Sequence, residues 1–313
     1  MSKTYDMLII GSGPAGLGCA LYAARAGIDA LVIEKSPLPG GQIINTTEVD
    51  NYLGLPGIGG FEMGDTFRKH VEKLGGTFTE DEISSIEKEG DTWKLTGNAD
   101  TYQGYTVVFA TGAHRSKLGI PGEEEYTGRG VSYCATCDGA FFRNKETVVI
   151  GGGDVAVEDA VYLAGLCSHV TLVHRRDELR AAHSVQESLF AKENVTVAWN
   201  TIPDEVIGEG TVQSLKVHNK ETGEETSISA SGVFIAVGMK PDSELAAGVC
   251  ELDERGYIKA GEDCKTSTPG IYAAGDVRTK VLRQVITAVA DGACAVTSAE
   301  GYLAGIKLKG SSR

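Results

Sequence analysis

The sequence predicts an α/β protein built from two similar units, with the second unit inserted in the first. The main observation is an internal duplication, in which LIIGSGPAGLGCALYAARAGIDALVIEK from Leu8 aligns without a gap with VVIGGGDVAVEDAVYLAGLCSHVTLVHR from Val148. Each copy consists of a β-branched run, a glycine-rich turn, a helix of small and apolar residues and a second β-branched run, which is the pattern of a parallel β-turn-α-β unit. The chain after residue 242 has no third copy and is too short for a domain of its own, so we expect it to return to the first unit.

The glycine-rich turns have the spacing of Rossmann-like dinucleotide-binding domains. The first glycine permits a tight turn, the second lets backbone N–H groups approach a pyrophosphate, and the third position needs a small residue between helix and strand. One such motif is a weak signal, but two motifs at matching places in a duplication predict two dinucleotide sites. The residues at the three positions are Gly11, Gly13 and Gly16 in the first copy and Gly151, Gly153 and Ala156 in the second.

The limits of the two domains follow from two further strand-like segments, YTVVFATGA and SGVFIAVGM, each of which ends at a glycine and closes one copy. We expect a discontinuous first domain of residues 1–113 and 243–313, and a second domain of residues 114–242 inserted in it. The two connections between the domains lie near Gly112 and Gly238.

The two copies differ at the end of their second strand. The first copy has Glu34 there, and its carboxylate can accept hydrogen bonds from ribose hydroxyls. The second copy has His174, followed by Arg175, Arg176 and, one turn further on, Arg180. These residues remove a repelling acid and supply forked cationic donors for a 2′-phosphate, so we expect a free ribose at the first site and NADP(H) at the second. The alternative is that the three arginines form ion pairs on a solvated helix start.

Charge and hydropathy exclude several classes of partner. The 313 residues carry a net charge of −14, and an acidic surface repels the phosphates of nucleic acids and of anionic membranes. No apolar stretch approaches the roughly 20 residues that span a bilayer, and the apolar run before GSGPAG is too short for a signal peptide. We therefore expect a cytoplasmic protein that binds neither nucleic acid nor membrane.

Cysteine usage favours redox chemistry over a structural metal. The chain has seven cysteines, of which Cys134 and Cys137 form a C-x-x-C pair, while Cys19, Cys167 and Cys294 lie in apolar helical contexts where we expect them to be buried. A zinc site is the alternative, but it needs four ligands, and no second C-x-x-C or histidine pair is present. We therefore predict no metal.

A C-x-x-C pair can form a reversible disulfide, and the first thiol of such a pair is usually the more exposed attacker. Asp138 follows directly and can move protons as thiolates form and leave, although it can equally well cap a turn with Gly139. If Phe141 and Phe142 lie in a strand they point in opposite directions, with one in the core and one exposed to a partner.

With these motifs, the whole chain resembles the low-molecular-weight thioredoxin reductases, which are NADPH-dependent flavoproteins of the pyridine nucleotide-disulfide oxidoreductase class. The resemblance covers all substantial segments of the chain. The matching motifs are GSGPAG, GGQ (40–42), TTEVDN (46–51), CATCDG (134–139), GGGDVAVE (151–158), HRRDELR (174–180), GIYAAGDV (270–277) and LRQV (282–285).

The resemblance implies FAD on the first dinucleotide fold, NADPH on the second, and a homodimer. The implied FAD contacts are Gly11, Gly13, Pro14, Ala15, Gly16, Glu34, Lys35, Gly40, Gly41, Gln42, Asn51, Thr111, Asp276, Val277, Arg283, Gln284 and Val285. The NADPH contacts are Gly151, Gly153, Asp154, Ala156, His174, Arg175, Arg176 and Arg180.

The resemblance also implies roles at the dithiol. Cys137 faces the flavin, Cys134 exchanges with thioredoxin, and Asp138 is the acid/base. Two departures are small: Val155 replaces a common serine, and Ala290 a common glycine. Because the second domain carries both the cysteines and the NADPH site, we expect it to rotate on its two connections between steps.

Other functions remain open at the level of the sequence. A flavin-dependent dithiol oxidase or a ferredoxin-linked reductase would share the C-x-x-C, although the ferredoxin-linked subgroup lacks the NADPH motifs that are intact here. A redox sensor or scaffold that binds nucleotides without turnover is a further alternative, which the intact CATCD and the two dinucleotide motifs disfavour.

Overall fold

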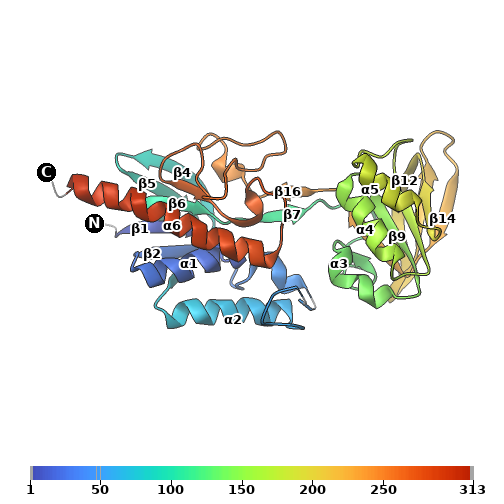
Figure 1. Cartoon of the computed structure of the whole chain (residues 1–313), viewed down its shortest axis with the longest axis horizontal. Coiled ribbons are helices and arrows are strands. Elements are labelled where there is room, and N and C mark those ends of the chain that lie inside the picture. Colours follow the sequence, from blue (N-terminus) through green and yellow to red (C-terminus); the bar gives the residue numbers. More distant parts are fainter. Residues whose placement is uncertain (1–2, 47, 50, 311–313) are drawn as a thin grey trace. The chain divides into compact units, whose positions relative to one another are not determined.

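The computed structural model describes residues 3–46, 48–49 and 51–310, and the chain divides into two compact units. Unit 1 contains the chain up to residue 114 and again from residue 240, and unit 2 contains residues 115–239. Figure 1 shows the chain leaving unit 1, forming unit 2 and returning to unit 1 as the C-terminal segment. Each unit has a parallel sheet with a helix after its first strand, which confirms the predicted fold class.

The central strands of unit 1 are parallel and have the order β3-β2-β1-β6, with β17 on the other side of β6. β17 pairs Ile271 with Val107, so the C-terminal segment extends the sheet that the N-terminal segment begins. The antiparallel strands β5 and β4 continue from β6. The strand bounds are β1 Thr4–Ile10, β2 Ala30–Glu34, β3 Thr77–Glu80, β4 Ile83–Glu89, β5 Thr92–Gly97, β6 Thr101–Phe109 and β17 Ile271–Ala273.

The core of unit 1 lies on both faces of this sheet. Met7 and Ile9 of β1 belong to one buried cluster, and Leu8 and Ile10 belong to another, as the two-residue period of a strand requires. The sequence of a strand that is covered on both faces is typically a continuous run of apolar residues. This is the reason why the segment before the first glycine turn is almost entirely apolar.

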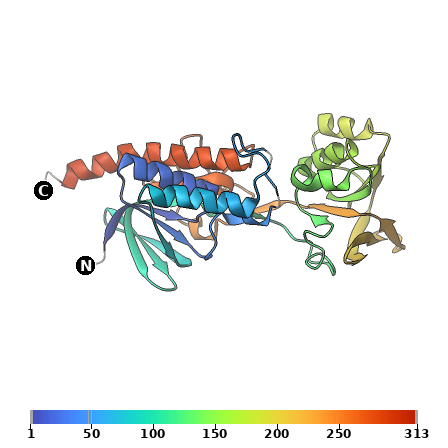
Figure 2. The same ribbon diagram turned by 90° about the horizontal axis from the view of Figure 1, so that it is seen from below.

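Three helices cover unit 1, and two of them pack at unusually close range. A Cβ atom at Gly18 of α1 would lie 2.7 Å from the carbonyl oxygen of Val289 in α6, and one at Gly292 of α6 would collide with the backbone of Ala15. Both views show α1 alongside α6 (Figures 1 and 2). Two glycines outside the motifs are thus explained by helix packing. The helix bounds are α1 Pro14–Ala26, α2 Gly60–Lys73 and α6 Val285–Gly310, with short 3-10 turns η1 Gly41–Asn45, η3 Glu244–Ala246 and η4 Gly275–Val277.

Unit 2 repeats the strand order of unit 1. Its five parallel strands have the order β11-β10-β9-β15-β8, so β11, β10, β9 and β15 correspond to β3, β2, β1 and β6. An antiparallel sheet of β12, β13 and β14 precedes β15, as the β4–β5 hairpin precedes β6. The bounds are β8 Val131–Ser132, α3 Ala135–Asp138, η2 Gly139–Phe142, β9 Glu146–Gly151, α4 Asp154–Ala164, β10 His169–Val173, α5 His183–Phe190, β11 Val195–Ala198, β12 Thr201–Glu209, β13 Thr211–Asn219, β14 Glu225–Ser229 and β15 Gly232–Ala236.

The two connections between the units pair with each other as the strands β7 (Ala113–Arg115) and β16 (Met239–Pro241). At the unit 1 end, Asp242 donates its N–H to the carbonyl of Gly112 (3.0 Å), and its carboxylate contacts His114 Nδ1 at 2.6 Å. At the unit 2 end, Ser116 donates to the carbonyl of Gly238 (3.0 Å). Within the described residues, no helix has the length and apolarity needed to cross a membrane.

Candidate active site and dinucleotide-binding loops

The glycine loop of unit 1 lies between β1 and α1, and its three glycines have different steric reasons. Gly11 has φ +103°, and a Cβ there would lie 2.5 Å from the carbonyl oxygen of Ala110. A Cβ at Gly16 would collide with the carbonyl oxygen of Gly11, so helix and strand touch there. At Gly13 the space is open, with only Gly41 Cα as near as 4.0 Å. Open space at the start of a helix is what the backbone approach to a pyrophosphate requires, so this loop fits a dinucleotide.

The Glu34 carboxylate is hydrogen-bonded to the same loop. Its Oε2 accepts the backbone N–H of Ser12 (2.6 Å) and the Ser12 hydroxyl (2.9 Å), and its Oε1 accepts the N–H of Ser36 (3.0 Å). A carboxylate has about four lone-pair sites, so it retains capacity for a ribose hydroxyl. The acid that the sequence singled out therefore lies beside the loop.

Other residues predicted to contact FAD gather around this loop or the start of α6. Gly40 donates to the carbonyl of Ser12 (3.0 Å), and a Cβ at Gly41 would lie 3.2 Å from Gly13 Cα. Asn51 donates through Nδ2 to Gln284 Oε1 (2.9 Å), which joins two segments that are far apart in the sequence.

The remaining predicted FAD residues lie as follows. Pro14 and Ala15 begin α1, Gln42 lies in η1, and Asp276 and Val277 lie in η4. Lys35 is exposed next to Glu34, Thr111 donates to the Asp242 carbonyl, Arg283 lies over the Tyr257 ring at 4.1 Å, and Val285 begins α6. Thr47 and Asp50 of the TTEVDN motif lie outside the described residues.

The glycine loop of unit 2 has the same open middle position. A Cβ at Gly151 would lie 2.5 Å from both the Ala156 Cβ and the Ala236 carbonyl oxygen, whereas a Cβ at Gly153 would meet no atom within 4 Å. Ala156 is fully buried at the third position. This loop therefore also fits a dinucleotide pyrophosphate, and the strand–helix contact in this copy leaves room for one methyl group.

His174 occupies a position in unit 2 that Glu34 occupies in unit 1, but it is buried. A Cβ at Gly152 would overlap its ring, and its Nε2 contacts the carbonyl of Glu178 at 2.9 Å. Burial lowers the pKa of His174, backbone hydrogen bonds oppose this, and the charges of Arg180 and Arg176 lower the pKa further. His174 thus packs as a neutral ring beneath the loop.

The segment after His174 passes along the glycine loop. Arg180 donates its N–H to the carbonyl of Gly152 (2.7 Å), and the N–H of Ala182 binds Asp154 Oδ1 (2.7 Å). The segment is a series of bends, since α5 begins only at His183, and the alternative of a solvated helix start is therefore wrong. The side chains of Arg175, Arg176 and Arg180 are exposed, and none of the salt bridges between described residues involves them.

The C-x-x-C pair forms a disulfide at the start of α3. Cys134 precedes this helix, its Cα lies 5.3 Å from that of Cys137, and its Sγ lies 3.4 Å from the Thr136 hydroxyl. Cys137 is exposed and Cys134 is half-buried, which is the reverse of the usual order. Exposure in this oxidised form therefore does not assign the attacking thiol.

Asp138 is bound to a residue that the motif did not include. The hydroxyl of Ser132 donates to Asp138 Oδ2 (2.6 Å) and accepts the backbone N–H of Cys134 (3.0 Å). The next residue, Tyr133, donates its hydroxyl to Glu123 Oε1 (2.6 Å). Burial and the Glu123 carboxylate together raise the pKa of Tyr133, so its hydroxyl stays protonated. Both residues before the first cysteine are thus fixed through their side chains.

The two adjacent phenylalanines divide between core and surface, but not for the expected reason. They lie in the 3-10 turn η2 and not in a strand. Phe142 packs edge-on against Phe234 with the ring centres 5.2 Å apart, and a Cβ at Gly232 would lie 2.6 Å from its ring. Phe141 is 55% exposed, so it offers an apolar surface close to the disulfide in sequence.

The other cysteines divide between buried and exposed positions. Cys19 and Cys167 are buried, as expected, but Cys294 is exposed, because it lies on the outer side of α6. In the described part of the chain, no group of three or more histidine, cysteine or acidic side chains is placed to hold a metal ion.

A buried ion cluster next to η4 was not anticipated from the sequence. Asp291 of α6 accepts hydrogen bonds from Arg278 Nη2 (2.6 Å), Lys280 Nζ (2.8 Å) and the backbone N–H of Gly275 (2.9 Å). Burial opposes the charge of Asp291, but its two cationic partners outweigh burial and lower the pKa of Asp291. The cluster fixes the turn that carries Asp276. Spacing alone does not reveal it, because the partners meet only when α6 folds back.

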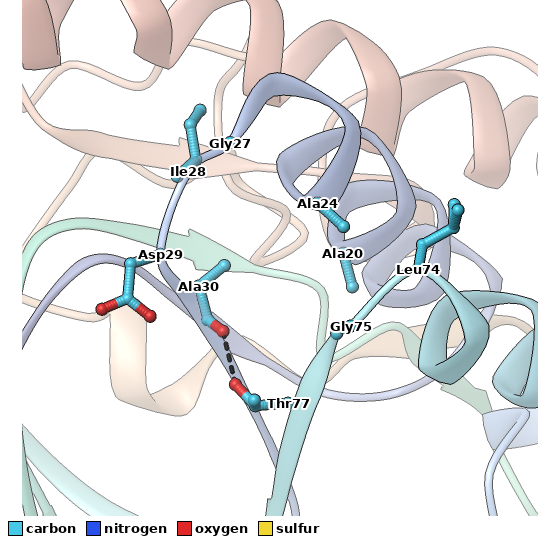
Figure 3. A pocket seen from close by; sticks show the side chains of 10 residues that line it. Ala20, Ala24, Gly27, Ile28, Asp29, Ala30, Leu74, Gly75 and Thr77 are labelled. Atoms are coloured by element: carbon cyan, nitrogen blue, oxygen red, sulfur yellow. Dashed lines mark hydrogen bonds between the residues drawn. The ribbon is translucent and has the colours of Figure 1, made fainter.

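One pocket of unit 1 lies at the opposite end of the sheet from the glycine loop. It has a volume of about 250 Å³ and is formed where α1 and α2 end and where β2 and β3 begin (Figure 3). Thr77 donates there to the Ala30 carbonyl (2.7 Å), and Leu74 is one of the lining residues. Ligands of parallel sheets bind at the carboxyl ends of the strands, so this pocket is not the dinucleotide site.

Two dinucleotide folds in one chain, one of which carries a C-x-x-C disulfide, define a disulfide oxidoreductase. The chain belongs to the pyridine nucleotide-disulphide oxidoreductase family, whose model matches residues 5–292, and within this family it falls among the thioredoxin reductases. It is 46% identical to a thioredoxin reductase of Peptoclostridium litorale, over 97% of this chain and 98% of that protein.

Solved structures give the same relationship. The thioredoxin reductase of Streptococcus pyogenes is 43% identical with a TM-score of 0.88, over 97% of this chain and all of that one. The thioredoxin reductase of Lactococcus lactis in the FR conformation is 44% identical with a TM-score of 0.70, over 96% of this chain and 99% of that one. The resemblance inferred from the motifs is confirmed.

Proposed function

We propose that the protein is an NADPH-dependent thioredoxin-disulfide reductase that uses FAD. The observation that carries the proposal is the Cys134–Cys137 disulfide next to Asp138, in the unit whose glycine loop is followed by exposed arginines. The other unit has a second open glycine loop with a carboxylate beside it. One site thus suits a 2′-phosphorylated nucleotide and the other a nucleotide with a free ribose.

The residues present fit the two cofactors. The loop of Gly11 to Gly16 and Glu34 would hold FAD, and the loop of Gly151 to Ala156 with Arg175 and Arg176 would hold NADPH. FAD, when bound, accepts a hydride from the nicotinamide and delivers two electrons to the disulfide. The role of this chain is to bind both nucleotides through backbone N–H groups and to select the coenzyme by charge.

The dithiol step uses residues of unit 2. When the Cys134–Cys137 disulfide accepts two electrons, its S–S bond breaks and both sulfurs become thiolates. The Cys134 thiolate attacks one sulfur of the thioredoxin disulfide, and the substrate S–S bond breaks as the mixed disulfide forms. Asp138 supplies a proton to the departing sulfur. The Cys137 thiolate then attacks the Cys134 sulfur, and the bond between Cys134 and thioredoxin breaks. The second substrate sulfur takes a proton from water as it leaves, and the Cys134–Cys137 disulfide is restored.

Three further features belong to this proposal. Phe141 is an exposed apolar side chain three residues after Asp138 and would contact the protein substrate. Unit 2 would rotate on the β7–β16 connection, because its cysteines must meet a flavin in one step and thioredoxin in another. The enzyme would be a cytoplasmic homodimer, as the resemblance implies.

The test is a variant that separates the two halves of the reaction. Cys134→Ser should abolish the reduction of thioredoxin but leave the reduction of the flavin by NADPH intact, because the nucleotide loops are unchanged. Stopped-flow absorbance of the flavin and a thioredoxin-coupled assay measure the two halves. Persistent thioredoxin reduction by Cys134→Ser would overturn the assignment of the attacking thiol.

Two further measurements test the electron donor and the rotation. Under anaerobic titration, NADPH should bleach the flavin at once, whereas a ferredoxin-linked reductase would stay oxidised. An engineered cross-link between the two units should block turnover, and full activity of the cross-linked protein would contradict rotation.

A further inference from the structure

Ser132 joins the first cysteine to the acid that follows the second. Its hydroxyl accepts the N–H of Cys134 (3.0 Å) and donates to Asp138 Oδ2 (2.6 Å), with the Cys134 carbonyl oxygen as a more distant acceptor (3.4 Å). A hydroxyl has one proton to donate and two lone pairs, so a single side chain serves both partners. Among the described residues, Asp138 accepts this one hydrogen bond through Oδ2, and Oδ1 accepts none.

The position of Ser132 is itself rigid. It is 5% exposed at the end of β8, where it pairs with Phe234 of β15. On its other side, Tyr133 is tied to Glu123, and Glu123 also accepts the backbone N–H groups of Leu118 (3.1 Å) and Gly119 (2.7 Å). The backbone of Ser132 is therefore held by the sheet, and this pairing does not involve the disulfide.

We propose that Ser132 is a positioning residue that holds one oxygen of Asp138 so that the other stays directed to the reacting sulfurs in both redox states. This inference rests on the proposed function of Asp138. With Oδ2 bound to the hydroxyl of a residue that is paired in the sheet, rotation of the carboxyl group is restricted when the disulfide opens. Ser132 itself exchanges no proton with the substrate.

Ser132 assists a thiol–disulfide exchange in which one S–S bond forms and another breaks. The Cys134 thiolate forms a bond to one substrate sulfur, the substrate S–S bond breaks, and its electron pair leaves with the second sulfur. That sulfur takes the proton of Asp138, which is replaced from water. An alkyl thiolate needs this proton to leave well, whereas an aromatic thiolate of low pKa does not.

This difference gives a test that does not require thioredoxin. The full chain, with Cys294→Ser to remove the exposed thiol, is reduced with dithiothreitol, desalted and mixed with bis(2-hydroxyethyl) disulfide or with 5,5′-dithiobis(2-nitrobenzoate). For Ser132→Ala we expect the rate with the alkyl disulfide to fall by about tenfold, as part of the contribution of a general acid is lost. The rate with the aromatic disulfide should stay within about twofold.

Three control variants make the result specific. Ser132→Thr retains a hydroxyl and should restore the alkyl rate. Tyr133→Phe removes the neighbouring hydroxyl, which is bound to Glu123 and not to Asp138, and should leave the ratio of the two rates unchanged. In an Asp138→Asn background, Ser132→Ala should have no additional effect on that ratio.

Equal slowing with both disulfides would show that Ser132 only supports the local fold, and it would overturn the proposal, as would unchanged rates with both. The result is independent of the proposed function as a whole. If the pre-reduced chain distinguishes the two small disulfides but NADPH drives no reduction of thioredoxin, the proposed function fails and the positioning role stands.

Discussion

The two glycine loops differ in how the second loop residue meets the residue at the end of the following strand. In unit 1, Ser12 donates two hydrogen bonds to Glu34. In unit 2 the aligned residues are Gly152 and His174, and the imidazole ring fills the space that a side chain at position 152 would need. The loop residue and the strand-end residue therefore depend on each other. In unit 1 a small polar residue is paired with an acid, and in unit 2 a glycine is paired with a buried ring.

The difference shows how one fold presents two chemistries. Glu34 places a carboxylate beside the first loop, and this carboxylate would repel a 2′-phosphate. The ring of His174 is buried, whereas the side chains of Arg175, Arg176 and Arg180, which follow it in the chain, are exposed. Four predictions test this comparison, from the largest expected effect to the smallest.

Replacing both arginines tests the basis of coenzyme choice. For Arg175→Gln/Arg176→Gln we expect the KM for NADPH to rise by about 100-fold or more, because charge-assisted hydrogen bonds contribute roughly 1.5–3 kcal/mol each, with little change for NADH. The pair Lys192→Gln/Lys220→Gln, which removes the same charge from other exposed sites of unit 2, is the control. Equal effects on both coenzymes would refute the 2′-phosphate interpretation.

Converting the second loop toward the first tests this pair of residues. Gly152→Ser should destabilise unit 2 by about 1–3 kcal/mol, since its side chain overlaps the ring of His174. Adding His174→Glu should recover part of this loss. Urea unfolding, followed by the fluorescence of Trp199 in a Trp93→Phe background, gives the free energy of unfolding. A double variant as unstable as the sum of its parts would show that the two positions are not coupled.

Removing the charge at the first loop tests its hydrogen bonds. Glu34→Gln weakens the bonds from Ser12, and we expect the affinity for FAD to fall by about tenfold, which corresponds to roughly 1–2 kcal/mol. Glu80→Gln is the matched control, because Glu80 is the exposed register partner of Glu34 on β3. Equilibrium titration of the apoprotein with FAD measures both, and a tight-binding Glu34→Gln protein would contradict the assignment.

The smallest effect is a pH dependence confined to unit 2. The pKa of His174 is lowered from 6.5, chiefly by burial, so the unfolded chain binds a proton that the folded unit does not. Its contribution to stability is complete above pH 6.5 and is lost as the pH falls toward the folded pKa. Urea unfolding detected at Trp199, whose ring centre lies 6.3 Å from that of His174, should show this loss. In His174→Gln the loss should disappear, and if it persists, another group is responsible.

The sequence predicted those features that recur along the chain or depend on local sterics. The duplication located both glycine loops and identified Glu34 and His174 as the point of difference, because these residues are equivalent within a repeated unit. It did not indicate how far the repetition extends. The β4–β5 hairpin and the β12–β14 sheet occupy equivalent places before β6 and β15, but their sequences are too different to align.

Features that depend on tertiary packing could not be predicted. Ser132 and Glu123 carry no motif, and their importance follows from the place where β8 ends relative to α3. Phe141 and Phe142 were expected to point in opposite directions if they lay in a strand, but they lie in a 3-10 turn that begins at Gly139. Cys294 was expected to be buried because its surroundings are apolar, although one side of a long helix still faces solvent.

The paired connections have a consequence for how this protein can be taken apart. Ser116 and Gly238 are hydrogen-bonded at 3.0 Å, so the first and last residues of unit 2 lie next to each other. Joining such neighbouring ends costs little loop entropy. We therefore expect unit 2, when it is excised between these residues, to fold as an independent domain. We also expect a short linker in its place to connect the two segments of unit 1.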